Sequence, residues 1–195
     1  STNTTSPISE WNGCRVLLST RNLEPLYDVV TLVRAYTEVV REEPDLRLLI
    51  LGDGSQKQAL KAIVDAAGLA HHVRFIGHIQ NHELPHYLRS ADIYVTTSTS
   101  DGSSVSLLEA MATGLPVIAS DIPTSRQWVN SGRNGWLFPT GDPKGLATVI
   151  RDAVSDSNHR TSYGRANRVL AERSANWKQG SRALLTSYVS ILNEL

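Results

Sequence analysis

The stretch Thr97–Asp121, TSTSDGSSVSLLEAMATGLPVIASD, shows how this 195-residue chain is built. It reads as the end of an extended run, a loop of small residues, an apolar helix that ends near Gly114, and a short buried strand. Two carboxylates stand out, Asp101 in the loop and Glu109 within the helix. A charged group in so apolar a helix needs partners, so the stretch indicates a site as well as a fold.

The same alternation of strand and helix extends outward along the chain. The expected strands are Arg15 to Thr20, Leu46 to Gly52, His72 to Gly77, Asp92 to Ser98, Pro116 to Ser120 and Gly135 to Phe138. Several are apolar on both faces, which is typical of a covered parallel sheet. The expected helices between them are Val29 to Glu43, Gln56 to Ala67, Glu83 to Ser90, Ser104 to Thr113 and Ser125 to Asn130.

After the last strand, Asp142 and Pro143 have the character of a helix N-cap and first helical residue. Helical sequence then continues to Leu195 in what we expect to be three pieces. The pattern predicts an α/β fold: a Rossmann-like, doubly wound, mainly parallel six-stranded sheet with helices on both faces and a C-terminal helical tail.

Composition excludes several classes of protein. The net charge is zero, which argues against a nucleic-acid-binding surface. Cys14 is the only cysteine, so no disulfide forms within the chain and a reducing compartment such as the cytoplasm is expected. No apolar run has the length of a transmembrane segment, and the start, STNTTSPISE, lacks the order of a signal peptide. We interpret residues 1–12 as a flexible lead-in and 13–195 as one domain.

Ligands of such sheets bind at the loops that follow the carboxyl ends of the strands. One of these loops, Gly102-Ser103-Ser104, leads directly into a helix. The first N–H groups of that helix, near Val105 and Ser106, lack intrahelical partners and lie at the positive end of the helix dipole, which suits a phosphate. An ordinary serine N-cap after a glycine turn is the alternative.

Glu109 favours the ligand-binding interpretation. It lies about five residues into the helix, or ~7.5 Å along its axis. Helical side chains lean toward the N-terminus, so the carboxylate can reach the space in front of the helix that the free N–H groups face. There it could accept hydrogen bonds from two adjacent ribose hydroxyls. The alternative, a glutamate on an exposed helix stripe, fits its apolar neighbours poorly.

These residues carry a resemblance. DGSSVSLLEAMATGLPVIASD resembles the signature of retaining glycosyltransferases of family 4 (group 1), which have the GT-B fold and two acids in an E-x7-E arrangement. Asp101 and Glu109 have that spacing, and EAMATGLPVI matches the remainder of the signature closely. The resemblance covers the whole chain, and it extends through LILGDG (Leu49 to Gly54), VRFIGHI (Val73 to Ile79), LRSADIYV (Leu88 to Val95) and NGWLFPTGD (Asn134 to Asp142).

The resemblance implies a site for a nucleoside diphosphate sugar, UDP- or GDP-linked, with no metal and no tightly bound cofactor. In this arrangement Glu109 holds the ribose, Asp101 contacts the transferred sugar, and Arg21 pairs with the phosphates. The implied catalytic residues are Asp101 and Arg21. The implied donor-binding residues are Gly52, Gly54, His78, Ile79, Gly102, Ser103, Ser104, Val105 and Glu109.

The chain also departs from the family pattern. Asp101 is one methylene shorter than the usual glutamate, and the usual G-F-G reads Gly102-Ser103-Ser104. The usual R-x4-K-G after the first strand reads RNLEPLYD, so Leu26 and Tyr27 occupy the region of the phosphate-binding lysine. Either Arg21 suffices, or another cation substitutes for the lysine, or donor affinity is weak. The candidate substitutes are Lys57 and Arg126.

The function implied is transfer of a sugar from a nucleoside diphosphate sugar to an acceptor hydroxyl with retention of configuration. GT-B enzymes work between two domains, so we expect a missing N-terminal acceptor domain, contacted by the helices from Asn176 onward. We expect the chain alone to bind donor with little turnover. Contact with the inner membrane surface through the missing domain stays open. So do two alternatives, a nucleotide-sugar-binding module without transfer activity and a GT-B nucleotide-sugar epimerase.

Two other patterns receive less support. His78, His82 and His86 recur every four residues, which on one helix could suggest zinc, but His78 follows a strand and Pro85 suits a first helical turn. The GDG of the second unit is followed by Lys57 where a dinucleotide fingerprint has its third glycine, so an oxidoreductase is not indicated.

Overall fold

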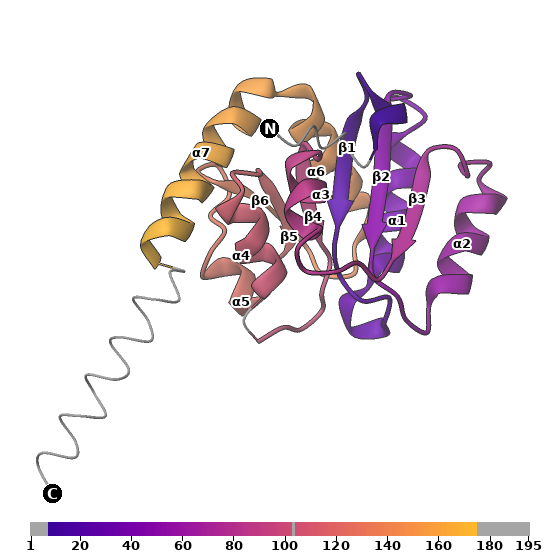
Figure 1. The fold of residues 1–195 in the computed structure, drawn as a ribbon, viewed down its shortest axis with the longest axis horizontal. Helices are drawn as coiled ribbons and strands as arrows, with labels where there is room; N and C mark the ends of the chain where they lie inside the picture. The colour runs from indigo at the N-terminus through magenta and orange to yellow at the C-terminus, as the bar shows by residue number, and fades with distance from the viewer. Residues whose placement is uncertain (1–7, 103, 175–195) are drawn as a thin grey trace, which may run out of the picture.

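Six parallel strands form one sheet in the computed structural model, which describes residues 8–102 and 104–174. The strand order is β3-β2-β1-β4-β5-β6 (Figure 1). The strands are β1 (Arg15–Ser19), β2 (Leu46–Leu51), β3 (Val73–Gly77), β4 (Ile93–Thr96), β5 (Val117–Ser120) and β6 (Gly135–Phe138). The order reverses between β1 and β4, so the doubly wound, Rossmann-like fold expected from the sequence is confirmed.

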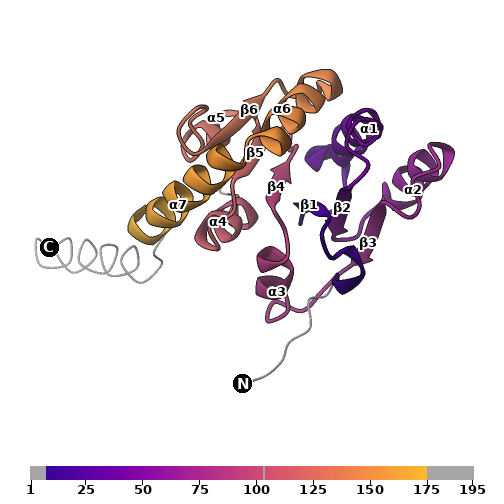
Figure 2. The same ribbon diagram turned by 90° about the horizontal axis from the view of Figure 1, so that it is seen from above.

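The helices occupy both faces of the sheet (Figure 2). They are α1 (Val29–Val39), α2 (Lys57–Ala66), α3 (Leu84–Arg89), α4 (Val105–Ala112), α5 (Pro123–Arg126), α6 (Pro143–Ser155) and α7 (Ser157–Ser174), with 3-10 turns η1 (Ser9–Trp11) and η2 (Pro25–Tyr27). The helices α1, α2 and α6 cover one face, while α3 and α4 cover the other and α7 packs against α4.

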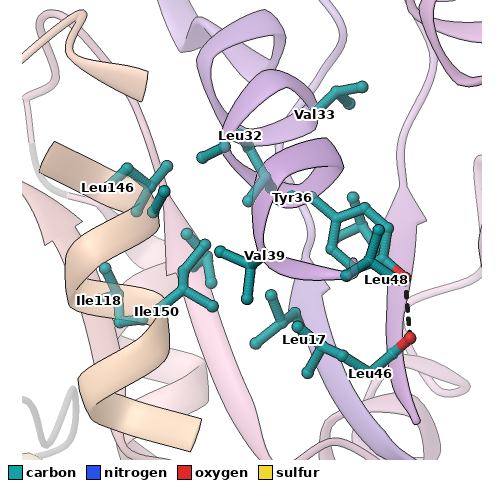
Figure 3. Packing of buried hydrophobic residues seen from close by; sticks show 14 of the residues in the cluster. Leu17, Leu32, Val33, Tyr36, Val39, Leu46, Leu48, Ile118, Leu146 and Ile150 are labelled. Carbon is teal, nitrogen blue, oxygen red and sulfur yellow. Dashed lines mark hydrogen bonds between the residues drawn. The ribbon is translucent and has the colours of Figure 1, made fainter. Parts of the chain in front are cut away.

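Each face has its own core. On the α1–α6 face, leucine, isoleucine and valine side chains interdigitate between the two helices and the central strands (Figure 3). Tyr36 is fully buried there, and its hydroxyl donates a hydrogen bond of 2.8 Å to the carbonyl of Leu46. That bond satisfies the phenol, which would otherwise oppose burial. Burial raises the pKa of Tyr36, so the phenol stays neutral.

The helix starts follow local capping chemistry. Asp142 caps α6 by accepting from the Lys144 N–H at 3.1 Å, with Pro143 as first residue, so the cap expected from the sequence is confirmed. Asp28 caps α1 from a left-handed backbone conformation with φ of 43°, and the Thr31 hydroxyl donates to its carboxylate at 2.7 Å. This cap ends the loop after β1 and fixes where α1 begins.

Two helices differ from their expected bounds by more than one residue at an end. The first ends at Val39 instead of Glu43, because in a longer helix the ring of Pro44 would clash with the carbonyl of Val40. The short α5 is Pro123–Arg126, while the sequence predicts Ser125 to Asn130. Pro123 supplies the first turn, and the N–H of Asn130 is taken by the side chain of Asn134 at 2.7 Å, which removes it from a helix ladder.

The predicted lead-in and tail are partly visible. Residues 8–12 of the lead-in include η1, where Ile8 and Trp11 are buried against the second core and the Arg74 guanidinium lies 5.1 Å from the centre of the Trp11 ring. The tail contributes α6 and α7. Its expected third piece, with the segment from Asn176 onward, lies outside the described residues, as does Ser103.

Candidate functional site

A small cavity lies at the carboxyl edge of the sheet, where loops after β1, β2 and β3 meet α4. Its volume is about 140 Å³, and its lining residues are Thr20, Asn22, Leu51, Gly52, His78, Ile79, Asn81, Leu84, Ser106 and Glu109. Four of the residues implied by the resemblance therefore line this cavity, namely Gly52, His78, Ile79 and Glu109. Segments more than fifty positions apart in the sequence build this cavity because their strands are neighbours in the sheet.

Glu109 brings a partnerless carboxylate to the cavity. The residue is half-buried, and its side chain has no hydrogen bond or ion pair with any residue in 8–102 or 104–174. Burial raises the pKa of Glu109 above its ordinary value of 4.5. A half-buried acceptor pair facing a cavity can bind a ligand that offers hydroxyl donors.

Arg21 and Asp101, the two residues implied as catalytic, meet directly. The Arg21 Nη2 atom lies 2.7 Å from Asp101 Oδ2, and their side chains are only 10% and 15% exposed. Arg21 Nη1 donates to the hydroxyl of Ser106 at 2.8 Å and to that of Ser104 at 3.3 Å. The ring of Tyr27 covers the guanidinium, 4.2 Å from its central carbon to the ring centre. The charge of Arg21 is therefore already compensated, and an incoming anion would compete with Asp101.

The N-terminus of α4 is open to a ligand. Ser104 stands at the N-cap position expected from the sequence, but it makes no side-chain cap hydrogen bond, and its hydroxyl accepts from Arg21. The structure therefore has a serine N-cap that lacks the usual side-chain bond. Val105 is 63% exposed, and a side chain at Gly102 would meet nothing within 4 Å. Gly102 and Val105 are therefore accessible near the end of the helix where the free N–H groups lie.

Gly52 and Gly54 are required by loop packing. A Cβ at Gly52, where φ is +123°, would lie 2.5 Å from the carbonyl oxygen of Arg21. A Cβ at Gly54 would lie 2.5 Å from that of Leu23. The loop after β2 thus presses against the loop after β1. Gly52 reaches the cavity wall, whereas Gly54 is not among its lining residues.

Comparison with known proteins agrees with this geometry. The family model of glycosyl transferases group 1 matches residues 3–169. The chain belongs to this family. It is 31% identical over 180 residues to a phosphatidyl-myo-inositol mannosyltransferase of Mycobacterium leprae, covering 92% of this chain and 47% of the relative. The chain therefore spans about half the length of that relative.

Solved structures with the same fold include sucrose-phosphate synthase of Thermosynechococcus elongatus, with a TM-score of 0.86, 24% identity, and coverage of 94% of this chain and 47% of that one. Anabaena HepE in complex with UDP-glucose has a TM-score of 0.82 and 22% identity, with coverage of 91% and 50%. These neighbours place the chain as one half of a GT-B fold.

The family's lysine-glycine pair has no direct equivalent here. Leu26 is 48% exposed and Tyr27 lies over Arg21. The two candidate substitutes are both paired with neighbouring acids: Lys57 Nζ lies 2.6 Å from Asp53 Oδ2. Arg126 makes two contacts with the Asp121 carboxylate, at 2.5 and 2.9 Å. Neither contributes to the cavity wall.

The histidines do not lie on one helix. His78 follows β3 and lines the cavity, His82 precedes α3, and His86 lies within it. Among the described residues, no group of three or more histidine, cysteine and acidic side chains is arranged to hold a metal ion. None of the described helices combines the length and apolar character needed to cross a membrane.

Sequence reasoning missed several polar residues of the site. Thr20 and Ser106 line the cavity, and Tyr94 lies fully buried beneath it. The available signals were weak: a threonine directly before Arg21, and a tyrosine between the apolar Ile93 and Val95 of a strand.

Proposed function

We propose that this chain is the nucleotide-sugar donor-binding domain of a retaining glycosyltransferase. The reaction is transfer of a sugar from a UDP- or GDP-linked donor to an acceptor hydroxyl. The observation that carries the proposal is the Glu109 carboxylate, which is half-buried, has no partner among residues 8–102 and 104–174, and lines a cavity at the carboxyl edge of a doubly wound sheet. A vicinal diol such as that of a ribose supplies the two donors this carboxylate lacks.

The other site residues have roles that follow from their chemistry. Arg21 and the open N-terminus of α4 offer positive charge to a diphosphate, including the charge that develops as it leaves. Asp101, held by Arg21, accepts hydroxyls of the transferred sugar. His78 and Ile79 line the same cavity, where the base would contact backbone groups. The Anabaena neighbour solved with UDP-glucose supports a donor of this class.

The size of the cavity supports a two-domain enzyme. Ligand pockets span about 300–1,000 Å³, and the cavity here is about 140 Å³. It accommodates part of a donor, and the remainder extends over the open surface toward Asp101. The chain spans 47% of its M. leprae relative. An N-terminal acceptor domain that closes over this surface would complete the pocket, so the chain alone is expected to bind nucleotide with little turnover.

Calorimetric titration of the chain with UDP, GDP and ADP tests the proposal. One nucleotide should bind, and Glu109→Ala should weaken it by about 1–3 kcal/mol, the effect of losing a buried hydrogen-bonding group. Glu38→Ala, on the exposed side of α1, is the matched control and should bind as the wild type does. The donor-site proposal fails if no nucleotide binds at millimolar concentration, or if both variants bind equally well.

A binding module without transfer activity is the second candidate. It is favoured by the exposed Leu26 and by the closed Arg21–Asp101 ion pair, which leaves no unpaired cation at the diphosphate position among the described residues of the site. Assaying sugar transfer after an N-terminal acceptor domain is restored separates the two. Transfer that disappears in Asp101→Asn supports the enzyme, whereas nucleotide binding without any transfer supports the module.

A further inference from the structure

A chain of hydroxyl groups runs beneath the cavity. Tyr94 in β4 has no exposed surface, yet it carries a hydroxyl that packing does not need. That hydroxyl lies 3.2 Å from the Thr20 hydroxyl, and the Ser106 hydroxyl is close enough to affect its pKa. Burial raises the pKa of Tyr94, and the bonds with Ser106 and Thr20 oppose the rise without removing it. Tyr94 is therefore a neutral phenol that joins two residues of the cavity wall.

Arg21 fixes the first direction in this chain of hydroxyl groups. A guanidinium can only donate, so the Ser106 oxygen accepts from Arg21 Nη1 at 2.8 Å. The Ser106 proton is then available to another acceptor, and the Tyr94 oxygen is close enough to take it. Either hydroxyl can donate in the Thr20–Tyr94 bond, and a Tyr94 that accepts from Ser106 has its own proton available for Thr20. The order Arg21, Ser106, Tyr94, Thr20 leaves the Thr20 proton as the free donor at the end of the chain.

Thr20 delivers that donor to the cavity. It lines the same 140 Å³ space as Glu109, so the cavity has a hydroxyl donor from β1 and a carboxylate acceptor from α4. A charged group at the head of a hydrogen-bonded chain polarises the members after it, which makes the last donor stronger. The cavity is therefore prepared for a group that donates to Glu109 and accepts from Thr20, as a sugar hydroxyl does.

We propose that Thr20 is a ligand-binding residue for the ribose side of the donor and that Tyr94 is a positioning residue that couples it, through Ser106, to Arg21. The inference rests on the proposed donor site, and it adds a polar contact to the cavity that Glu109 lines. A structural role alone would be met by phenylalanine at position 94, because the ring is fully enclosed by core residues.

The test is a set of titrations with the nucleotide that the wild-type chain binds. Thr20→Val and Tyr94→Phe each delete one hydroxyl with little change of shape, and each should weaken binding about 3- to 10-fold. Thr20→Ser keeps the hydroxyl and should restore most of what Thr20→Val loses. Because the two hydroxyls act in one chain, the double variant Thr20→Val/Tyr94→Phe should bind about as weakly as either single variant.

Tyr163→Phe is the matched control. Tyr163 on α7 is also buried, but its ring stacks on His159 and meets Trp136 of β6 edge-on, away from the cavity, so its variant should bind as the wild type does. Circular dichroism of every variant verifies that it is folded.

The outcomes separate this inference from the donor-site proposal. If no nucleotide binds the wild type, both are overturned. If Glu109→Ala weakens binding while Thr20→Val and Tyr94→Phe do not, the donor site stands and only the role of Thr20 and Tyr94 is overturned. Multiplicative losses in the double variant would show two independent contacts and overturn the coupling. Equal losses in Thr20→Val and Thr20→Ser would show a packing effect and overturn the hydroxyl contact.

Discussion

Glu109 is held where its own charge is disfavoured. Its pKa is raised above 4.5 by burial, so the folded chain holds this proton more tightly than the unfolded chain does. The stability from the protonated form is complete below about pH 4.5 and is lost as pH rises through the folded pKa. At neutral pH the charge therefore opposes folding, which is understandable if a ligand compensates it.

Glu109→Gln should accordingly stabilise the ligand-free chain while it weakens nucleotide binding. Thermal unfolding followed by circular dichroism should give a higher midpoint for the variant at pH 7, and a smaller difference at pH 4, where the wild-type carboxyl is largely protonated. A variant that melts below the wild type at pH 7 contradicts this account.

Replacing Arg21 and replacing Asp101 should have different effects on the protein. Removing the cation in Arg21→Ala leaves a carboxylate that is 15% exposed without its partner, so unfolding free energy should fall by about 3 kcal/mol. Asp101→Asn keeps an acceptor for Arg21 and removes its competing charge, so nucleotide should bind no more weakly than in the wild type. Urea denaturation and calorimetry measure the two effects. Equal losses of nucleotide binding in both variants would falsify the competition between Asp101 and a diphosphate.

Leu26 and Tyr27 suggest a way to strengthen the site. The double variant Leu26→Lys/Tyr27→Gly adds a cation where the family has one and uncovers a face of Arg21, so nucleotide should bind about 10-fold more tightly. Val169→Lys is a matched control, because Val169 is an exposed valine on α7 away from the cavity. If both variants change affinity equally, the gain is a general charge effect.

At the scale of elements, α4 and α7 approach each other through two glycines. A methyl group at Gly164 of α7 would collide with the backbone carbonyl of Gly114, at the turn that ends α4. Helix propensity favours Gly164→Ala by up to about 1 kcal/mol, but a clash with backbone outweighs it, so a net loss of about 1–2 kcal/mol is expected. Urea denaturation checks this, with Ser162→Ala on the exposed side of α7 as control. A stabilised Gly164→Ala variant would mean that the two helices separate easily.

The sequence predicts elements better than it predicts contacts between them. Hydrophobic periodicity and the Asp142 cap indicate the alternating fold because each depends on residues a few positions apart. The Arg21–Asp101 pair joins residues eighty positions apart, and it exists because β1 and β4 are neighbours across the reversal in strand order. Spacing along the chain carries no such information. The boundaries of α5 likewise depend on a side chain of Asn134 that takes the N–H of Asn130.

For the whole molecule, the first described turn belongs to the folded unit. Trp11 is 7% exposed and packs beneath the Arg74 guanidinium on the same face as α3 and α4. Trp11→Ala should lower the unfolding free energy by about 3 kcal/mol, measured by urea denaturation. The exposed Glu10→Ala, which removes only the surface ion pair with Arg74, should change it by less than about 1 kcal/mol. A small loss for Trp11→Ala would place the start of the domain after residue 12.

The loop between β1 and α1 is tied to two others along its length. Leu23 N–H donates to the Asp53 carbonyl and the Gln56 N–H donates to Leu23, each at 2.9 Å. The Thr99 N–H donates to the Leu26 carbonyl at 2.9 Å. A chimaera that takes only this loop from a relative would therefore lose matching contacts with the loop after β2 and with the loop after β4. Exchanging this loop between members of the family therefore requires moving the three loops together, along with Gly52, the glycine just after β2 that lets two of them touch.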